Sequence, residues 1–538
     1  MKRTAKAMIV SLATILLLSG CTEANNNDAT PAGTSSAKTG KVTLTMMTQS
    51  SPLAPADPNE KLIFKRLEEK TGVHIEWKTL VSGDTFVEKR NLAIATGELP
   101  DAIFRPDFTD NDILQLAKDG TIIPLEDLID KYMPNFKKVL EKAPQYKAMI
   151  TAPDGHIYSL PWIEELGAGK EAIQAVDDLP WINVEWLNKL GLKMPTTTEE
   201  LKQVLLAFKQ NDPAGNGKTI PMSFISKPGP DGKTGAEDLT FLFGSFGLGD
   251  NNDHLVVSDD GKVIFTASEN GYKEGIKYLN DLYKNGLLDI EAPSQDFNTF
   301  LAKGKENRYG LYFTWDKGNI TGMNDKYDVM PALKGPDGQK NVTRTNGVGF
   351  SRGRGMVITK INKNLEATAK WADQLYDPLQ SVQNNWGTYG DTTQQNIFEF
   401  DETKKMLKHL PLQGAAPVEL RQKTSVDGPL AILDSYYGTV TTKPDDAAWR
   451  LDILKKIMVP DMKAKNNYPN VFFSVDELSK ITRIEADLFP YINRMRSEWT
   501  ENGKVEEQWP TYLKELDRLG LKEWLKIKQD GYDRSMKK

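Results

Sequence analysis

The segment "KVTLTMMTQ" at residues 41–49, together with the segments that follow it, decides the fold class. Its apolar and polar residues alternate, which predicts a strand. In "EKLIFKRLEEKTG" (60–72) the apolar residues have helical spacing and glycine closes the segment, which predicts a helix, and "VHIEWKTL" (73–80) again has the pattern of a strand. A helix over 84–97 and a short buried strand within 99–107 continue the alternation. This order of elements predicts an α/β lobe with a mainly parallel sheet.

Polar residues at the ends of two of these strands form a candidate binding rim. Gln49 ends the first predicted strand, and Arg105 and Asp107 lie at the end of the third. Ligands of parallel α/β sheets bind beyond the carboxyl ends of the strands. The sequence therefore predicts that these three side chains lie at the entrance to a ligand site.

The chain is too long for one ordinary domain, since its 538 residues predict at least two lobes. Further elements are expected along the rest of the chain: strands at 308–315 and 355–360, and helices at 199–210, 269–286 and 505–534, the last with a break at Gly520. The charge is nearly balanced, with 68 basic and 74 acidic residues and a net charge of −6. Because no run of Lys and Arg is present, no nucleic-acid partner is expected.

The N-terminal segment has the order of a signal peptide. A positively charged start (Lys2, Arg3 and Lys6) is followed by an apolar run from Ala7 to Leu18 and by the small residues Ser19 and Gly20. The apolar run is shorter than the roughly 20 residues that a permanent membrane span needs. Residues 1–20 are therefore predicted to be a signal peptide.

Cys21 is the only cysteine of the chain and lies directly after this segment, in "LLLSGCTE" (16–23). The sequence Leu18-Ser19-Gly20-Cys21 resembles a lipobox, the cleavage and acylation site of bacterial lipoproteins. We expect Cys21 to carry a lipid anchor on the extracytoplasmic face of the cell membrane. Residues 21–40, which contain no large apolar side chain, are expected to form a flexible linker. The alternative is an ordinary secretory peptide with an incidental cysteine.

Five phrases resemble one family in order along the chain. They are "DGTIIPLEDLI" (119–129), "APDGHIYSLP" (152–161), "EWLNKLGLKMPTTTEEL" (185–201), "GYKEGIKYLNDLYKNGLLD" (271–289) and "EEQWPTYLKELDRLGLKEWLKI" (506–527). The family is the extracellular solute-binding proteins (family one) of bacterial ABC importers, especially the long lipoproteins of Gram-positive bacteria. The resemblance implies a two-lobed periplasmic-binding-protein-like fold (type II), with a mainly parallel sheet and flanking helices in each lobe and a cleft between the lobes.

The resemblance also implies a ligand and partners. An oligosaccharide would bind in the cleft by hinge closure and pass to membrane permease subunits that are driven by a cytoplasmic ATPase. The protein itself is expected to be a monomer that contacts the membrane only through its lipid. Residues 41–155 and 310–365 are expected to form the N-terminal lobe, and residues 156–309 and 366–538 the C-terminal lobe with a helical C-terminal extension.

Tryptophan is the residue type on which oligosaccharide recognition would depend, because sugar rings stack their apolar faces on aromatic side chains. Six of the 11 Trp lie in segments predicted to be helical, where packing is expected, and Trp77 alternates in a strand. The candidates for binding lie at strand ends or in loops: Trp162, Trp181, Trp315 and Trp386, with Tyr389 beside Trp386. For each tryptophan, structural packing is an equal alternative. Arg352 and Arg354 would hold a carboxylate if the sugar were a uronate, and otherwise belong to a solvated loop.

The segment "NDPAGNGKTIP" (211–221) resembles a calcium loop of alginate-oligosaccharide-binding relatives, but the acidic pair that follows the Lys in those relatives is missing here. Calcium needs about 6–8 oxygen ligands, and Asp212 and Asn216 supply only a few. A surface turn without an ion is therefore expected, with a structural calcium as the alternative. No other cofactor is expected.

Motifs for catalysis are weak, so we expect no enzyme. The four histidines are scattered without the spacing of a zinc site. "GFSRG" (349–353) formally fits G-x-S-x-G, but a strand continues where a nucleophile elbow needs a helix. Two alternatives stay open: a binding protein for a peptide or other non-sugar solute, and a surface glycoside hydrolase, whose two carboxylates need only meet in space.

Overall fold

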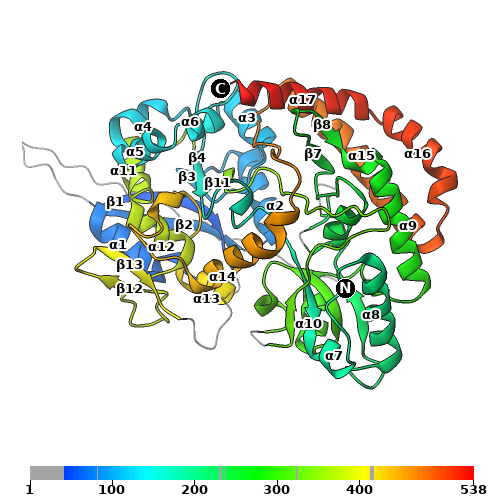
Figure 1. Ribbon diagram of the computed structural model, residues 1–538. Coiled ribbons are helices and arrows are strands. Elements are labelled where there is room, and N and C mark those ends of the chain that lie inside the picture. Colours follow the sequence, from blue (N-terminus) through cyan, green and yellow to red (C-terminus); the bar gives the residue numbers. More distant parts are fainter. Residues whose placement is uncertain are drawn as a thin grey trace, which may run out of the picture. The chain divides into compact units, whose positions relative to one another are not determined.

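The computed structural model describes residues 41–51, 53–81, 83–229, 233–235, 237–322, 325–411 and 417–537 (Figure 1). The predicted signal peptide, Cys21 and the predicted linker to residue 40 therefore lie outside the described residues. Within the described ranges, no helix has both the length and the apolar character needed to cross a membrane.

The larger sheet has six strands, in the order β14-β4-β11-β3-β1-β2. They are β1 (Val42–Gln49), β2 (Val73–Val81), β3 (Ala102–Phe104), β4 (Leu160–Glu164), β11 (Phe350–Ile358) and β14 (Leu430–Ile432). β1 pairs in parallel with β2 and β3, and β14 pairs in parallel with β4, whereas β11 is antiparallel to both of its neighbours. The mainly parallel sheet predicted from the first hundred residues is thus present.

The smaller sheet has four strands in the order β10-β5-β9-β6. They are β5 (Leu179–Asn183), β6 (Ile220–Ser223), β9 (Tyr309–Thr314) and β10 (Tyr327–Val329). Only β6 and β9 are parallel, and β5 is antiparallel to both β9 and β10. This sheet is therefore mixed rather than mainly parallel, because β5 lies between β10 and β9 and is antiparallel to both. Two hairpins lie outside the sheets: β7 (Leu255–Val257) with β8 (Val263–Phe265), and β12 (Phe398–Asp401) with β13 (Met406–His409).

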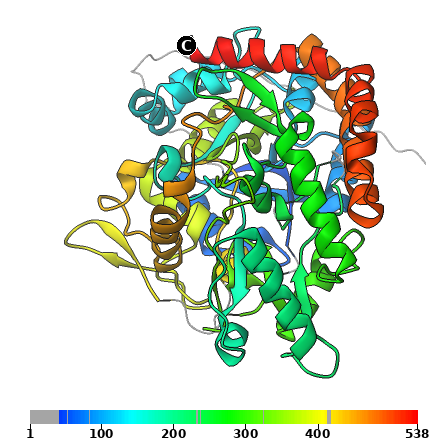
Figure 2. The same cartoon turned by 45° about the vertical axis from the view of Figure 1, so that its right-hand side comes forward.

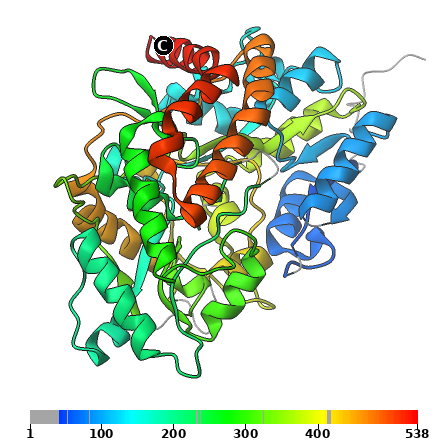
Figure 3. The same cartoon turned by 90° about the vertical axis from the view of Figure 1, so that its right-hand side faces the viewer.

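Helices cover both sheets (Figures 1 and 2). Those on the side of the six-stranded sheet are α1 (Leu62–Thr71), α2 (Gly83–Thr96), α3 (Asp110–Lys118), α4 (Glu126–Tyr132), α5 (Pro134–Lys142), α6 (Gln145–Ile150), α11 (Leu365–Gln374), α12 (Pro378–Trp386) and α13 (Pro417–Thr424). Those beside the smaller sheet are α7 (Val184–Lys189), α8 (Thr198–Asn211), α10 (Phe297–Lys305) and α14 (Asp445–Ile453). The remaining long helices are α9 (Asn270–Lys284), α15 (Val475–Asn502), α16 (Val505–Arg518) and α17 (Leu521–Met536), and Figure 3 shows α9, α15 and α16 side by side.

Local sequence signals fix several of these helices. Thr197 and Glu200 form a reciprocal capping box at the start of α8, and Ser474 and Glu477 do the same for α15. Such boxes satisfy backbone N–H groups that the first helical turn leaves without partners. Gly520 has a φ of 103° and separates α16 from α17, as the sequence predicted. The "GFSRG" segment lies at the start of strand β11, so the expectation that no nucleophile elbow forms there is confirmed.

Sheet membership differs from the expected lobe ranges at four strands. β4 and β14 belong to the six-stranded sheet although their residues were assigned to the C-terminal lobe, and β9 and β10 belong to the smaller sheet although most of their residues were assigned to the N-terminal lobe. The chain crosses between the sheets more often than the sequence division assumed. The boundaries of the lobes themselves stay a prediction.

Two stretches that connect the sheets are important for the site. Residues 165–178 run from β4 to β5, and residues 330–349 run from β10 back to β11. We call these two stretches the crossing segments. They contact each other directly, because the backbone N–H of Thr345 donates to the carbonyl of Ala175 over 3.1 Å.

Candidate functional site

A cavity of about 180 Å³ lies between the two sheets, and four tryptophans line it. Trp162 is on β4 of the larger sheet and Trp386 ends α12, while Trp315 directly follows β9 of the smaller sheet and Trp449 is on α14. We call this space the tryptophan cavity. Three of the four tryptophans that were predicted to bind a ligand therefore meet in one place.

Each of three indole rings carries an arginine guanidinium over one face. The distances from Cζ to the ring centroid are 4.5 Å for Arg354 over Trp162, 4.1 Å for Arg421 over Trp386 and 3.4 Å for Arg450 over Trp315. A cation over the face of an indole is attracted by the electron-rich ring. The arginines thus hold the rings in fixed orientations around the cavity.

Arg450 is held by backbone oxygens rather than by a carboxylate. It is 1% exposed, and its guanidinium donates to the carbonyls of Ile173, Val176 and Asp177 in a crossing segment and to that of Trp315. Burial lowers the pKa of Arg450 to about 10, so the group stays charged at neutral pH. Its hydrogen bonds connect the crossing segment to the wall that carries Trp315.

Glu164 and Gln174 connect the cavity to both crossing segments. The Gln174 side-chain amide donates to Glu164 Oε2 over 3.1 Å, and the backbone N–H of Gly349 donates to Gln174 Oε1 over 2.8 Å. The backbone N–H of Glu164 in turn donates to the carbonyl of Gly349 over 2.9 Å. Gly349 has a φ of 76°, and a Cβ there would lie 2.7 Å from the Glu164 carbonyl, so this junction requires glycine.

Buried polar atoms beside the cavity that have no hydrogen-bond partner in the described part of the chain include Trp162 Nε1, Trp386 Nε1 and Asp427 Oδ1. An unpartnered buried donor or acceptor costs about 1–3 kcal/mol. Burial also raises the pKa of Glu164, although Arg421 and Arg354 oppose the shift.

None of the three predicted rim residues is among the residues that line this cavity. Arg105 Nε is 3.2 Å from Asp427 Oδ2, and Arg354 Nη2 is 2.9 Å from the same oxygen, so Arg105 connects to the tryptophan cavity through Asp427. The Gln49 amide donates to the Asp107 carboxylate. Arg105 and Asp107 both have positive φ, near 50°, which is uncommon for residues other than glycine and is typical of functional loops.

Trp181 and Tyr389 do not line the tryptophan cavity. Trp181 is fully buried in the core of the smaller sheet, donates its Nε1–H to the carbonyl of Thr314, and stacks at 5.4 Å on Trp449. Trp181 therefore packs against Trp449, one of the residues that line the cavity. Tyr389 stacks at 5.3 Å on Phe400, with Arg66 over its ring. For these two side chains, the structure shows packing rather than a place in the cavity.

Sequence reasoning missed several lining residues: Glu164, Gln174, Arg421, Trp449 and Arg450. Trp449 was assigned to helix packing, yet its ring both packs on Trp181 and faces the cavity. Helical periodicity alone does not show which face of α14 meets another lobe. The neighbouring pair Trp449-Arg450 was the one available signal, since Trp and Arg are enriched at binding surfaces.

The two arginines considered for a uronate are both paired within the chain. Arg352 Nε donates to Asp110 Oδ1 over 2.7 Å, and its side chain is buried. Arg354 pairs with Asp427 and covers Trp162. A uronate carboxylate would have to compete with these internal partners.

A second and much larger cavity, about 1160 Å³, lies between the start of α3 and helices α15 and α17. We call it the large cavity. Charged side chains that line it form ion pairs with one another. Arg352 pairs with Asp110, the Lys233 ammonium lies 2.6 Å from a carboxylate oxygen of Asp253, and the Lys528 ammonium lies 3.5 Å from a carboxylate oxygen of Glu485. Burial would raise the pKa of Asp253, but Lys233 outweighs it and lowers that pKa to about 2.

In the calcium-type loop, the Asp212 carboxylate is held by backbone N–H groups of the loop itself. Asp212 accepts hydrogen bonds from the backbone N–H groups of Gly217 and Thr219, and Asn216 has a φ of 57°. Hydrogen bonds from Thr219 and Gly217 lower the pKa of Asp212. Within the described ranges, no three His, Cys, Asp or Glu side chains are grouped in a way that could hold a metal ion. Asp212 and Asn216 supply one carboxylate and one side-chain amide, whereas calcium takes about 6–8 oxygen ligands, which include backbone carbonyls. Whether this loop holds calcium stays a prediction.

A comparison with known protein families identifies the family to which the chain belongs. Residues 51–380 match the bacterial extracellular solute-binding proteins, and the chain belongs to this family. The relatives are binding proteins and not enzymes.

Individual relatives agree with this assignment. The chain is 57% identical over 537 residues, 99% of its own length and 98% of the relative's, to the fructooligosaccharide ABC transporter substrate-binding protein FusA of Streptococcus pneumoniae. The solved structure of FusA in complex with kestose has 60% identity and a TM-score of 0.87, and the match covers 92% of this chain and 99% of that one. A human-milk-oligosaccharide ("HMO") binding protein of a Bifidobacterium longum infantis ABC transporter has 25% identity and a TM-score of 0.76, with 92% and 99% covered. The predicted two-lobed solute-binding fold is confirmed.

Proposed function

We propose that the protein captures a neutral fructooligosaccharide in the tryptophan cavity and delivers it to the permease of an ABC importer. The proposal rests on the convergence of four indole rings on one cavity, from β4, the end of β9, α12 and α14. Sugar rings stack on such faces, and a ligand that touches both lobes stabilises the closed arrangement. The relationship to a fructooligosaccharide-binding protein of 57% identity supports this class of sugar.

The charges of the cavity favour a neutral ligand. Arg450 donates to four carbonyls, Arg354 pairs with Asp427, and Arg421 lies over Trp386 near Glu164. An uncharged sugar can exchange hydroxyl hydrogen bonds with these groups without separating any ion pair. A carboxylated sugar would have to be desolvated against Glu164 and Asp316, which also line the space.

Isothermal titration calorimetry with kestose tests the proposal directly. We expect one site with micromolar affinity, about −8 kcal/mol, and no heat with a maltotriose or a short peptide of similar size. Binding of the peptide without binding of kestose would support a non-sugar solute instead. Release of free fructose during the titration would point to a hydrolase.

The attachment to the membrane is part of the proposal. Because Cys21 follows an apolar segment and small residues, we infer that it is acylated on the extracytoplasmic face, and that the protein is a lipid-anchored monomer. Labelled palmitate fed to the producing cells should appear in the protein and should be absent from a Cys21→Ala variant. Sedimentation of the purified protein should give a single species of one chain.

We further propose that the loop at Asp212 and Asn216 works without calcium. Calorimetry with calcium chloride should show no saturable heat, because the loop supplies too few oxygens. A stoichiometric binding isotherm that an Asp212→Asn variant loses would contradict this.

A further inference from the structure

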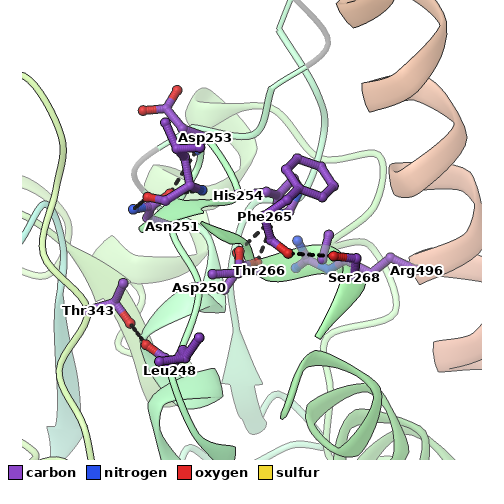
Figure 4. A network of polar contacts seen from close by, with 12 residues as sticks. Leu248, Asp250, Asn251, Asp253, His254, Phe265, Thr266, Ser268, Thr343 and Arg496 are labelled. Carbon is purple, nitrogen blue, oxygen red and sulfur yellow. Dashed lines mark hydrogen bonds and ion pairs between the residues drawn. The ribbon is translucent and has the colours of Figure 1, made fainter. Parts of the chain in front are cut away.

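A third cavity, about 220 Å³, lies behind the crossing segments and shares no lining residue with the tryptophan cavity. Its walls come from residues 247–248, 256–259, 341–346 and 463–467. On one wall the Thr343 hydroxyl donates to the Leu248 carbonyl, as Figure 4 shows. The cavity is therefore framed by a crossing segment on one side and by the β7–β8 hairpin region on the other.

Arg344 is the unusual residue of this cavity. It is 8% exposed, and its Nη1 donates to the carbonyl of Lys465 over 2.9 Å. Its Nε has no hydrogen-bond partner in the described part of the chain, and no ion pair to a described carboxylate is formed. Burial alone lowers the pKa of Arg344, with no opposing contribution from a neighbouring acid. Every other buried arginine discussed above has carboxylates or several carbonyls around it.

The remaining charges around the cavity do not neutralise Arg344. Asp259 is the one acidic residue among the lining residues, and its carboxylate accepts from the backbone N–H of Lys465 and lies 3.8 Å from the Lys465 ammonium. Lys463 adds a further positive charge and donates to Gln339. The cavity thus has an excess of positive charge around a buried guanidinium.

We propose that this cavity binds a small oxyanion, a phosphate or carboxylate group, on Nη2 of Arg344. A buried cation without a counter-charge is costly, and a guanidinium N–H donates a strong charge-assisted hydrogen bond to an oxygen of such an anion. Nη1 is already used by the Lys465 carbonyl and Nε has no accessible surface, so Nη2 is the nitrogen left for a ligand. The site does not depend on the proposed sugar specificity.

Arg344 is connected to the sugar site through neighbouring residues of the two crossing segments. The next residue, Thr345, donates its N–H to Ala175, and the neighbour of Ala175, Gln174, lines the tryptophan cavity. An anion on Arg344 would therefore fix the backbone of one crossing segment next to its contact with the other.

Calorimetry on the full chain, with sodium phosphate and with sodium acetate at an ionic strength held constant with chloride, tests the proposal. We expect one saturable site for at least one of the two anions, with a dissociation constant on the order of 1 mM or tighter. Comparison of the two titrations tells a phosphate site from a carboxylate site. An absence of saturable binding for both anions up to ~50 mM would overturn the proposal.

Two variants separate a specific site from general attraction. Arg344→Met should weaken binding at least about tenfold, whereas Lys465→Met, which removes an exposed cation at the rim, should change it less than about twofold. An equal loss of anion affinity in both variants would mean that the bound anion is an adventitious ion only. Circular dichroism and urea denaturation of Arg344→Met show whether the variant is folded, and if it does not fold, wild-type crystals soaked in phosphate must show an anion at Arg344 or the proposal fails.

Discussion

The tryptophan cavity and the large cavity contain similar kinds of side chains but differ in how those side chains are satisfied. The large cavity has about 1160 Å³ and the tryptophan cavity about 180 Å³. In the large cavity, Asp110, Asp253 and Glu485 each pair with a cation of the same wall. Beside the tryptophan cavity, Trp162 Nε1 and Asp427 Oδ1 lack partners in the described ranges, and four indoles come together.

The converging aromatic faces, rather than volume, make the tryptophan cavity the candidate ligand site. A space lined by paired charges is stable when filled with water, so its volume alone does not indicate a ligand. Indole faces that border a cavity offer stacking surfaces to the apolar face of a sugar ring. The comparison predicts structural effects at the large cavity and binding effects at the tryptophan cavity.

Removal of Asp110 should give the largest effect and should act on stability alone. Asp110→Ala leaves Arg352 buried without its carboxylate, so the free energy of unfolding should fall by about 3 kcal/mol or more. Urea denaturation measures this, with Asp119→Ala, an exposed position near the end of the same helix, as the control. Kestose affinity of the folded variant should stay unchanged, and a large loss of affinity would place the ligand in the large cavity.

Removal of one cavity indole should give the next largest effect and should act on binding. Trp162→Ala and Trp315→Ala should each weaken kestose binding about 100-fold, because a stacked aromatic in an enclosed site is a dominant contact. Trp77→Ala is the matched control, since Trp77 is on β2 at the opposite edge of the sheet from β14 and β4. Calorimetry that finds equal affinities for all three variants would remove the indoles from the site.

A smaller effect is expected from Asp178, at the end of a crossing segment. Both of its carboxylate oxygens lack hydrogen-bond partners among the described residues, and burial raises the pKa of Asp178 well above its ordinary value, with Glu237 and Asp177 adding to the shift and Arg450 opposing it. The folded chain therefore binds a proton more tightly than the unfolded chain, so this group's contribution to stability falls as the pH rises.

Asp178→Asn removes this titration. The variant should melt at a higher temperature than the wild type at pH 8, and the two melting curves should converge as the pH falls and the wild-type carboxyl takes up its proton. Asp119→Asn, an exposed carboxyl, should show no such pH-dependent difference. A variant that melts lower than the wild type at pH 8 would contradict the assignment of Asp178 as a group that burial disfavours when ionised.

The smallest effect is expected from filling part of the large cavity. Ala486→Leu places a larger side chain on the face of α15 that lines this cavity. Kestose affinity should change by less than about twofold, because no group of the tryptophan cavity is touched. A loss greater than about tenfold would show that the large cavity takes part in sugar binding.

Much of the fold followed from local patterns. The alternating strand and helix segments between residues 41 and 104 gave the parallel part of the larger sheet, because period and capping are local properties of the sequence. The sequence did not predict which sheet contains β4, β9, β10 and β14. The sheet that a short apolar strand joins depends on where the chain crosses between the sheets, and these crossings have no periodic pattern in the sequence. The same limit affected the lobe ranges.

The residues that line the candidate site could be predicted in part. Trp162, Trp315 and Trp386 were candidates because they lie at strand ends or in loops, and the structure brings these three rings to one cavity, whereas their role in binding stays a prediction. Trp181 occupies the same kind of position in the sequence, but its ring is enclosed by the smaller sheet. The arginines over the indoles and the junction of Glu164, Gln174 and Gly349 bring together residues far apart in the chain, so only the structure could show them.

The decisive measurement is a crystal structure of the protein with kestose. We expect sugar density between Trp162, Trp315 and Trp386, in contact with the faces of these indole rings. Sugar density in the large cavity, with the tryptophan cavity filled only by water, would contradict it.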